Sequence, residues 1–209
     1  MNSLAQALGR IIAVNSPSTY EEDEIRYGLE VFLGGLLQVL LLAAIGWHLG
    51  LLKEIMAIML SFGLYRRCAG GAHCTAYYRC TLMTLITLPV LAYLCRLIDN
   101  RFFWVYFMVV FLFSMEAIYL KAPVDTDVKP IVDPAERSRL KLRSAILIVL
   151  LQAAVLGFHW FGQDLLAIAV LIGICYQSLT MTRLGASYVR FWDIILSKWW
   201  GNNWGKEEC

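Results

Sequence analysis

The chain has 209 residues, of which 59% are apolar and only 16% are charged, and its formal net charge is +2. Such a chain has too little polar surface to solvate a globule of this size, so the composition excludes an ordinary water-soluble domain. It favours a lipid bilayer as the solvent, which a helix spans with about 20 apolar residues.

The N-terminal segment lacks the basic start, apolar stretch and small-residue cleavage site of a signal peptide. Its first half is expected to form an amphipathic helix in the membrane interface. Ser18 and Glu21 have the spacing of a capping box, which predicts a second helix that runs into the first span. We therefore expect residues 1–28 to remain attached as interfacial helices.

Uncharged runs then predict about six transmembrane helices within residues 29–182. They cover residues 31–50, 55–65, 81–95, 102–115, 144–163 and 165–182. The second run would be only about 16 Å long as a helix, and extending it backwards takes in Lys53 and Glu54. The third run is also short and contains Pro89. Two short spans predict that the connection between them dips below the cytoplasmic membrane surface.

That connection, residues 66–80, reads RRCAGGAHCTAYYRC. On one continuous helix, His73 and Cys80 would be about 10 Å apart along the axis, too far for direct proton transfer. Gly70 and Gly71 are the most plausible place for a break in the helix. With that break, Cys80 and His73 become a candidate nucleophile and base, and the glycine N–H groups become available to an oxyanion.

A new helix is expected to start near Ala76 or Tyr77. Cys80 would then lie in its first turn, where the helix dipole and Arg79 favour the reactive thiolate. Two other interpretations of the segment remain open. A tight turn could use the cysteines as small apolar residues, or Cys68, His73, Cys74 and Cys80 could bind zinc, although their spacing fits no common zinc knuckle.

The second half of the chain contains a proline-containing loop and a tryptophan-rich end. Asp133, followed by Pro134, Ala135 and Glu136, is expected to cap a new helix. Residues 183–209 alternate tryptophan with charge, which is typical of an interfacial tail.

The basic residues predict the orientation in the membrane. With the N-terminus in the cytoplasm, 15 of the 18 Lys and Arg residues lie inside, and only Lys53, Arg96 and Arg101 lie outside. Both termini and residues 66–80 are then cytoplasmic, where a reducing environment argues against a structural disulfide. No internal repeat or soluble linker interrupts the chain, so residues 1–209 are expected to form a single all-α polytopic membrane domain.

Ionisable residues at or inside predicted spans are candidates for function. Glu30 is interpreted first as an ion pair with Arg26 and alternatively as a carboxylate that orients His73. Glu116 and His159 could instead line the pathway of a small transporter or exporter. A metal-binding membrane sensor is a third class.

One group of residues resembles a known family in type and spacing, namely Arg67, Gly70, Gly71, Ala72, His73 and Cys80. They match the R-x-x-G-G-A-H-x-x-x-x-x-x-C core of the accessory gene regulator B (AgrB) family, membrane cysteine endopeptidases that process cyclic-peptide quorum-sensing precursors. Lys121-Ala122-Pro123 followed by Lys129-Pro130-Ile131 resembles the cytoplasmic A-P…K-P-I loop of that family. The length and the six-span pattern are similar throughout, whereas Cys68 and Cys74 are additional thiols beside the motif.

The resemblance implies a bacterial plasma-membrane enzyme that works without a cofactor or metal. Cys80, activated by His73, would cleave an AgrD-like precursor and hold its N-terminal part as a thioester. A cysteine or serine of the precursor would then close a thiolactone or lactone. The resemblance also implies that Arg67, Gly70 and Gly71 support the oxyanion or the substrate and that the enzyme is a homodimer. Its partners would be the precursor and the lipid bilayer, with no nucleic acid.

Overall fold

The computed structural model describes residues 22–124 and 133–200, and it is helical almost throughout. The helices are α2 (Glu22–Leu49), α3 (Leu52–Ala69), α4 (Tyr77–Cys95), the short 3-10 helix η1 (Asn100–Phe102), α5 (Phe103–Lys121), α6 (Pro134–Trp160), α7 (Asp164–Thr180) and α8 (Arg183–Trp200). No strand is present among these residues, and the all-α prediction is confirmed. The predicted N-terminal amphipathic helix lies outside the described residues.

Each of the six predicted apolar runs lies mainly within one of the helices α2 to α7. Four helices are long and apolar enough to cross a bilayer by themselves, namely α2, α4, α5 and α6, and α7 with α8 gives a fifth if that bent pair is counted as one span. The chain is therefore a multi-pass membrane protein with four or five candidate spans, and the count of six stays a prediction. Among helices α2 to α7, the two that fall short alone are α3 and α7, and these are the central ones.

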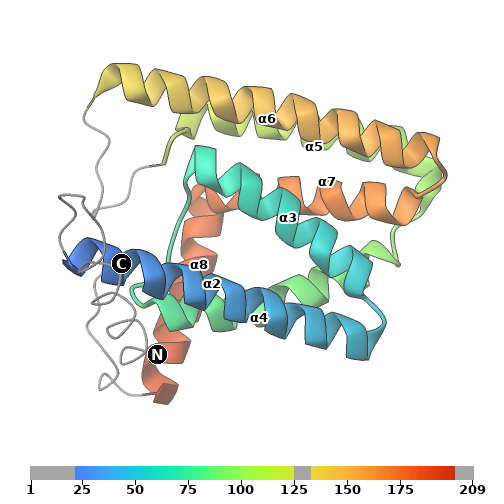
Figure 1. Ribbon diagram of the computed structural model, residues 1–209. Helices are drawn as coiled ribbons and strands as arrows, with labels where there is room; N and C mark the ends of the chain where they lie inside the picture. The colour runs from blue at the N-terminus through green and yellow to red at the C-terminus, as the bar shows by residue number, and fades with distance from the viewer. Residues whose placement is uncertain (1–21, 125–132, 201–209) are drawn as a thin grey trace.

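Helices α3 and α7 form the middle of the bundle. Figure 1 shows them between a layer of α2 and α4 and a layer of α5 and α6, and α3 contacts α2, α4, α6 and α7. The two backbones approach closely at Gly173, where an added Cβ would collide with Ser61 and with the backbone of Ile58. Small residues permit such close contact between membrane helices. Because its neighbours shield it, α7 does not need the long lipid-facing surface of an outer span.

The last helix changes direction sharply. Helix α8 follows α7 after a bend of 86° and crosses the end of the bundle where α3 ends and α4 begins (Figure 1). At the same end, α6 begins at Asp133, whose carboxylate accepts a hydrogen bond from the Ala135 N–H at 2.9 Å. The predicted cap is thus confirmed. This end of the bundle also carries residues 66–80.

Candidate functional site

The predicted break between Gly70 and Cys80 is present. Helix α3 ends at Ala69, with Gly70 as its C-cap, and α4 begins at Tyr77 after Ala76. Gly70 has a φ of +71°, which an L side chain rarely adopts, and an added Cβ would collide with the Val124 carbonyl oxygen. Cys80 therefore lies in the first turn of α4, as the sequence predicted, and is not on a continuous helix with His73.

The loop between α3 and α4 is held by polar contacts to α7 and α3. The Gln177 side-chain amide donates to the Gly70 carbonyl at 2.6 Å, and the Ala72 N–H donates to the Thr180 carbonyl at 3.3 Å. Arg66 donates to the Ala72 carbonyl at 2.5 Å. Gln177 is completely buried in the apolar helix α7, so it is well placed to fix the loop rather than to face lipid.

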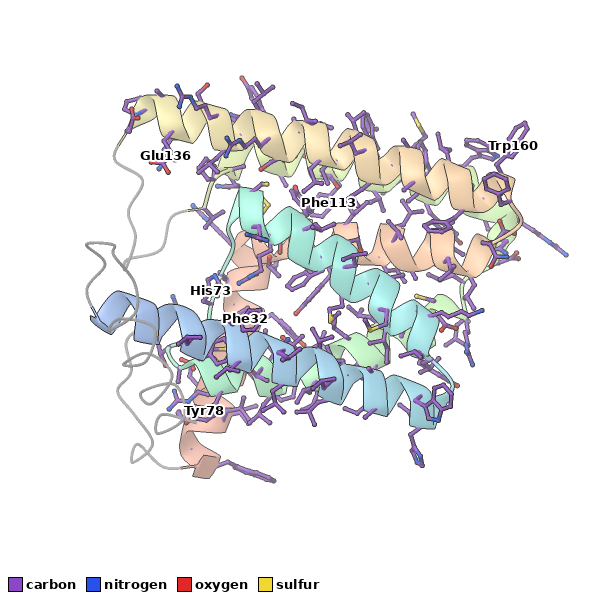
Figure 2. The ribbon with its side chains drawn as sticks, in the orientation of Figure 1. Phe32, His73, Tyr78, Phe113, Glu136 and Trp160 are labelled. Atoms are coloured by element: carbon purple, nitrogen blue, oxygen red, sulfur yellow. The ribbon has the colours of Figure 1, made fainter. Side chains whose placement is uncertain are left out.

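The Cys80 sulfur has several polar neighbours from the loop. It interacts with the His73 side chain, with the Cys74 thiol and with the Cys74 backbone N–H, and the Arg66 guanidinium contributes a positive charge nearby. Its thiol is partly accessible, and the His73 side chain is exposed. Figure 2 places His73 at the end of the bundle that also carries Glu136, opposite to Trp160. The structure therefore brings the two predicted catalytic residues together.

Cys74 and Cys80 differ in their surroundings. Cys74 is only 3% exposed and packs with Met83 and Val189 in a small apolar cluster. The interaction with Cys80, followed by burial, raises the pKa of the Cys74 thiol above its ordinary value. A thiolate is the reactive form of cysteine, so Cys74 is suited to donate its S–H to Cys80 rather than to attack a substrate itself.

The two arginines at the end of α3 also have different surroundings. Arg67 is exposed, whereas Arg66 reaches Gln177 and Thr180 and interacts electrostatically with Cys80 and Cys74. Arg67 falls on the motif that predicted it as a site residue, whereas no sequence pattern distinguished Arg66. Arg79, which was predicted to act on Cys80, forms an ion pair with Asp193. The cation that acts electrostatically on the Cys80 sulfur is Arg66.

The remaining ionisable candidates are separated from this site. The Glu30 side chain lies outside what the structure describes. Glu116 is exposed near the C-terminal end of α5, and His159 lies near the opposite end of the bundle, stacked on Phe103 and bonded to Asp164 at 2.6 Å. Glu116 and His159 therefore do not share a pathway in this structure.

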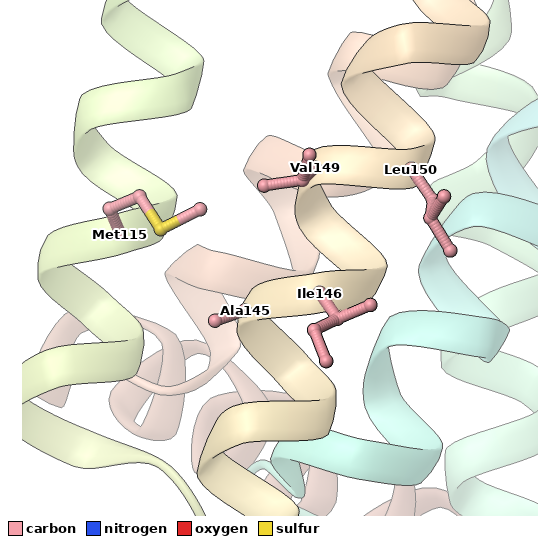
Figure 3. A pocket seen from close by; sticks show the side chains of 5 residues that line it. All are labelled: Met115, Ala145, Ile146, Val149 and Leu150. Atoms are coloured by element: carbon pink, nitrogen blue, oxygen red, sulfur yellow. The ribbon is translucent and has the colours of Figure 1, made fainter.

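Neither a metal cluster nor an apolar hollow coincides with the Cys80 site in residues 22–124 and 133–200. Within them, no group of three or more His, Cys, Asp or Glu side chains is placed to hold a metal ion. A shallow apolar hollow on the outer face of α5 and α6 is lined by Met115, Ala145, Ile146, Val149 and Leu150 (Figure 3). It contains none of the polar groups around Cys80, and its position suits contact with lipid.

Comparison with known proteins gives one consistent result. The family model for accessory gene regulator B matches residues 2–181. An AgrB-like protein of Clostridium perfringens strain SM101 is 23% identical over 93% of this chain and 99% of its own length. An AgrB-like protein of Listeria monocytogenes strain HCC23 is 25% identical over 84% of this chain and 86% of its own. No solved structure matches the chain significantly.

Proposed function

The chain belongs to the accessory gene regulator B family, and from this premise we propose that it is a membrane cysteine endopeptidase that cleaves and cyclises an AgrD-like precursor. Family membership indicates a role in accessory gene regulator peptide processing and implies an AgrD-like peptide as the partner. The observation that carries the proposal is the placement of Cys80 beside His73 after the helix break.

In the proposed first step, His73 takes the proton of Cys80 and the Cys80 sulfur attacks the carbonyl carbon of the scissile peptide bond. The carbonyl oxygen becomes an oxyanion, and His73 returns the proton to the leaving amine as the bond to the C-terminal tail breaks. The N-terminal part of the precursor remains on Cys80 as a thioester. A precursor thiol or hydroxyl then attacks this thioester, which closes the ring and releases Cys80 as a thiol.

Two groups are proposed to support the oxyanion. The Arg66 guanidinium is close enough to the Cys80 sulfur to interact with it electrostatically, so it is proposed to stabilise the negative charge that develops on the substrate there. The Gly71 N–H donates to no other described group, whereas the Gly70 N–H donates to the Arg66 carbonyl at 2.9 Å. Of the two glycine N–H groups named from the sequence, Gly71 is therefore the better candidate donor.

The loop also supports the cyclisation step. Gly71, Cys74 and Ala76 of the loop are buried, so this part of the site is shielded by protein. Shielding matters because water that reached the thioester would release a linear peptide instead of a ring. The family resemblance implies that the precursor has an acidic C-terminal tail, and Arg67, which is exposed, is proposed to attract that tail. Glu30 remains a proposed orienting residue, and the homodimer remains a proposed assembly.

The proposal predicts that Cys80→Ala and His73→Ala each abolish cleavage of a co-expressed AgrD-like precursor. Cys80 supplies the attacking sulfur and His73 moves its proton, so neither alanine can replace them. Cys68→Ala should cleave normally, whereas Cys74→Ala should still cleave but more slowly, because one hydrogen bond to the reacting sulfur is lost. Cleavage is followed by mass spectrometry at matched protein levels, and normal cleavage by Cys80→Ala would refute the proposal.

A further inference from the structure

Helix α8 packs directly against the loop that carries the catalytic pair. Val189 of α8 is buried in one apolar cluster with Cys74 and Met83, and Cys80 and Trp192 pack against the same cluster. Because α8 crosses the end of the bundle at 86° to α7, its buried face lies over the start of α4 (Figure 1). The helix is thus in position to restrain the loop.

Asp193 makes the polar part of this contact. Its carboxylate accepts hydrogen bonds from the Thr75 hydroxyl at 2.9 Å, from the Thr75 N–H at 3.3 Å and from the Arg79 guanidinium at 3.2 Å. Thr75 and Arg79 also bond to each other at 3.0 Å. The Arg79 and Asp193 side chains are only 10% and 16% exposed, so water screens this ion pair less than it would an open surface pair.

The positions of the two Asp193 partners matter. Thr75 comes two residues after His73, and Arg79 comes immediately before Cys80. Asp193 therefore ties the His73 side of the loop to the Cys80 side through one carboxylate. Catalysis by a positioned pair is sensitive to such restraint, because a misplacement of about 1 Å can cost about 10²-fold in rate.

We propose that Asp193 is a positioning residue that holds His73 and Cys80 at reacting distance by fastening Thr75 and Arg79 to α8. The role of this restraint in peptide cleavage rests on the proposed function, whereas its effect on the Cys80 thiol does not. In the sequence, Asp193 is the only acidic residue between Asp164 and Glu207. This isolated negative charge is the signal by which the sequence could have identified Asp193 as a candidate.

The test uses the full-length protein in lipid nanodiscs and compares Asp193→Asn with the parent. Iodoacetamide is the probe, and the alkylation rate of Cys80 is followed by mass spectrometry as a function of pH. We expect alkylation near neutral pH to slow by about tenfold, with the pH profile displaced, because Cys80 loses its fixed relation to His73. With a co-expressed precursor, the cleavage rate at saturating substrate should fall while the KM stays near that of the parent.

Asp164→Asn is the matched control, because it also removes an aspartate from an ion pair but at the opposite end of the bundle. It should leave the Cys80 profile unchanged. Thr75→Val is a second variant that keeps the backbone N–H and removes only the hydroxyl. Thr75→Val should change the pH profile of Cys80 alkylation in the same direction as Asp193→Asn. The double variant should be alkylated no more slowly than Asp193→Asn alone, because both substitutions remove the same restraint.

If Cys80 in Asp193→Asn is alkylated with the same rate and pH dependence as in the parent, the positioning role is overturned, even if the variant is thermally less stable. If Asp193→Asn does not fold, a parental profile in Thr75→Val overturns it. The proposed function fails on a different result, namely cleavage of the precursor by Cys80→Ala. That result does not depend on the alkylation rates.

Discussion

Gly70 combines two constraints at a single residue. Its φ of +71° lies in the left-handed region, and its Cα faces the carbonyl oxygen of Val124 too closely to admit a side chain. The neighbouring Val124 N–H donates to the Ala69 carbonyl at 2.9 Å, so the end of α3 is fixed against the segment that follows α5. The break between α3 and α4, which keeps His73 off the helix that carries Cys80, thus requires a residue without a Cβ atom at position 70.

Gly70→Ala is expected to destabilise the protein and to abolish cleavage. Gly70 combines its φ of +71° with a ψ of −159°, a backbone conformation that essentially only glycine adopts and that costs an L residue about 1–3 kcal/mol. The collision with Val124 adds to this cost because the backbone cannot easily move away. Gly63→Ala within α3 is the control, since nothing lies near its added Cβ and alanine favours a helix by about 1 kcal/mol. The midpoint of thermal unfolding in detergent measures both, and equal midpoints would contradict the account.

At the scale of elements, α3 combines a central position with a charged start. Glu54 in its first turn is 3% exposed and accepts two hydrogen bonds from Arg96, which follows the end of α4, at 2.8 and 3.1 Å. The sequence showed Glu54 only as an interruption of a short apolar run. The ion pair explains how α3 can carry a carboxylate there, because a buried charge is tolerated when it is paired.

Arg96→Met should therefore destabilise the contact between α3 and α4. Removing one partner of a buried pair costs about 3–5 kcal/mol, and we expect somewhat less here because the Arg96 side chain is 43% exposed. Adding Glu54→Gln should restore much of the loss, since no unpaired carboxylate then remains. Unfolding in detergent is the measurement, and a double variant less stable than Arg96→Met would contradict this explanation.

At the scale of the whole molecule, charge separates along the bundle. Basic residues gather at the end of the bundle where His73 lies. They are found in the last turns of α3 and α5, in the first turns of α4 and α6, and along α8. Lys53 and Arg96 lie at the other end, with Arg101 nearby in η1. This distribution supports the proposal that the catalytic loop faces the cytoplasm, where positive residues are retained.

Cysteine labelling tests that orientation. Arg139→Cys and Arg101→Cys each introduce an exposed thiol, one on the basic start of α6 and one at the opposite end. In intact cells, a membrane-impermeant maleimide should label Arg101→Cys, whereas Arg139→Cys should require permeabilised cells. The parent protein, which keeps its own cysteines, is the background control. The reverse labelling pattern would invert the proposed orientation.

Much of this protein is determined by local sequence. The apolar runs predicted the positions of α2 to α7, Asp133 predicted the start of α6, and Gly70 with Gly71 predicted the break before His73. These features follow from hydrophobicity, capping and backbone freedom, which depend on residues close together in the chain. The same local reasoning placed Cys80 in the first turn of α4.

Only the tertiary structure decided which distant groups contact the loop that carries His73. Gln177 donates a hydrogen bond to Gly70, Asp193 accepts one from Thr75, and both of these contacts join residues more than 100 positions apart. Arg66 interacts electrostatically with Cys80. Such pairings depend on how α7 and α8 pack over α3 and α4. Neither the periodicity nor the charge of a single segment encodes that packing, so the sequence predicted His73 and Cys80 as the candidate pair, and the fold decided which distant residues contact the loop between them.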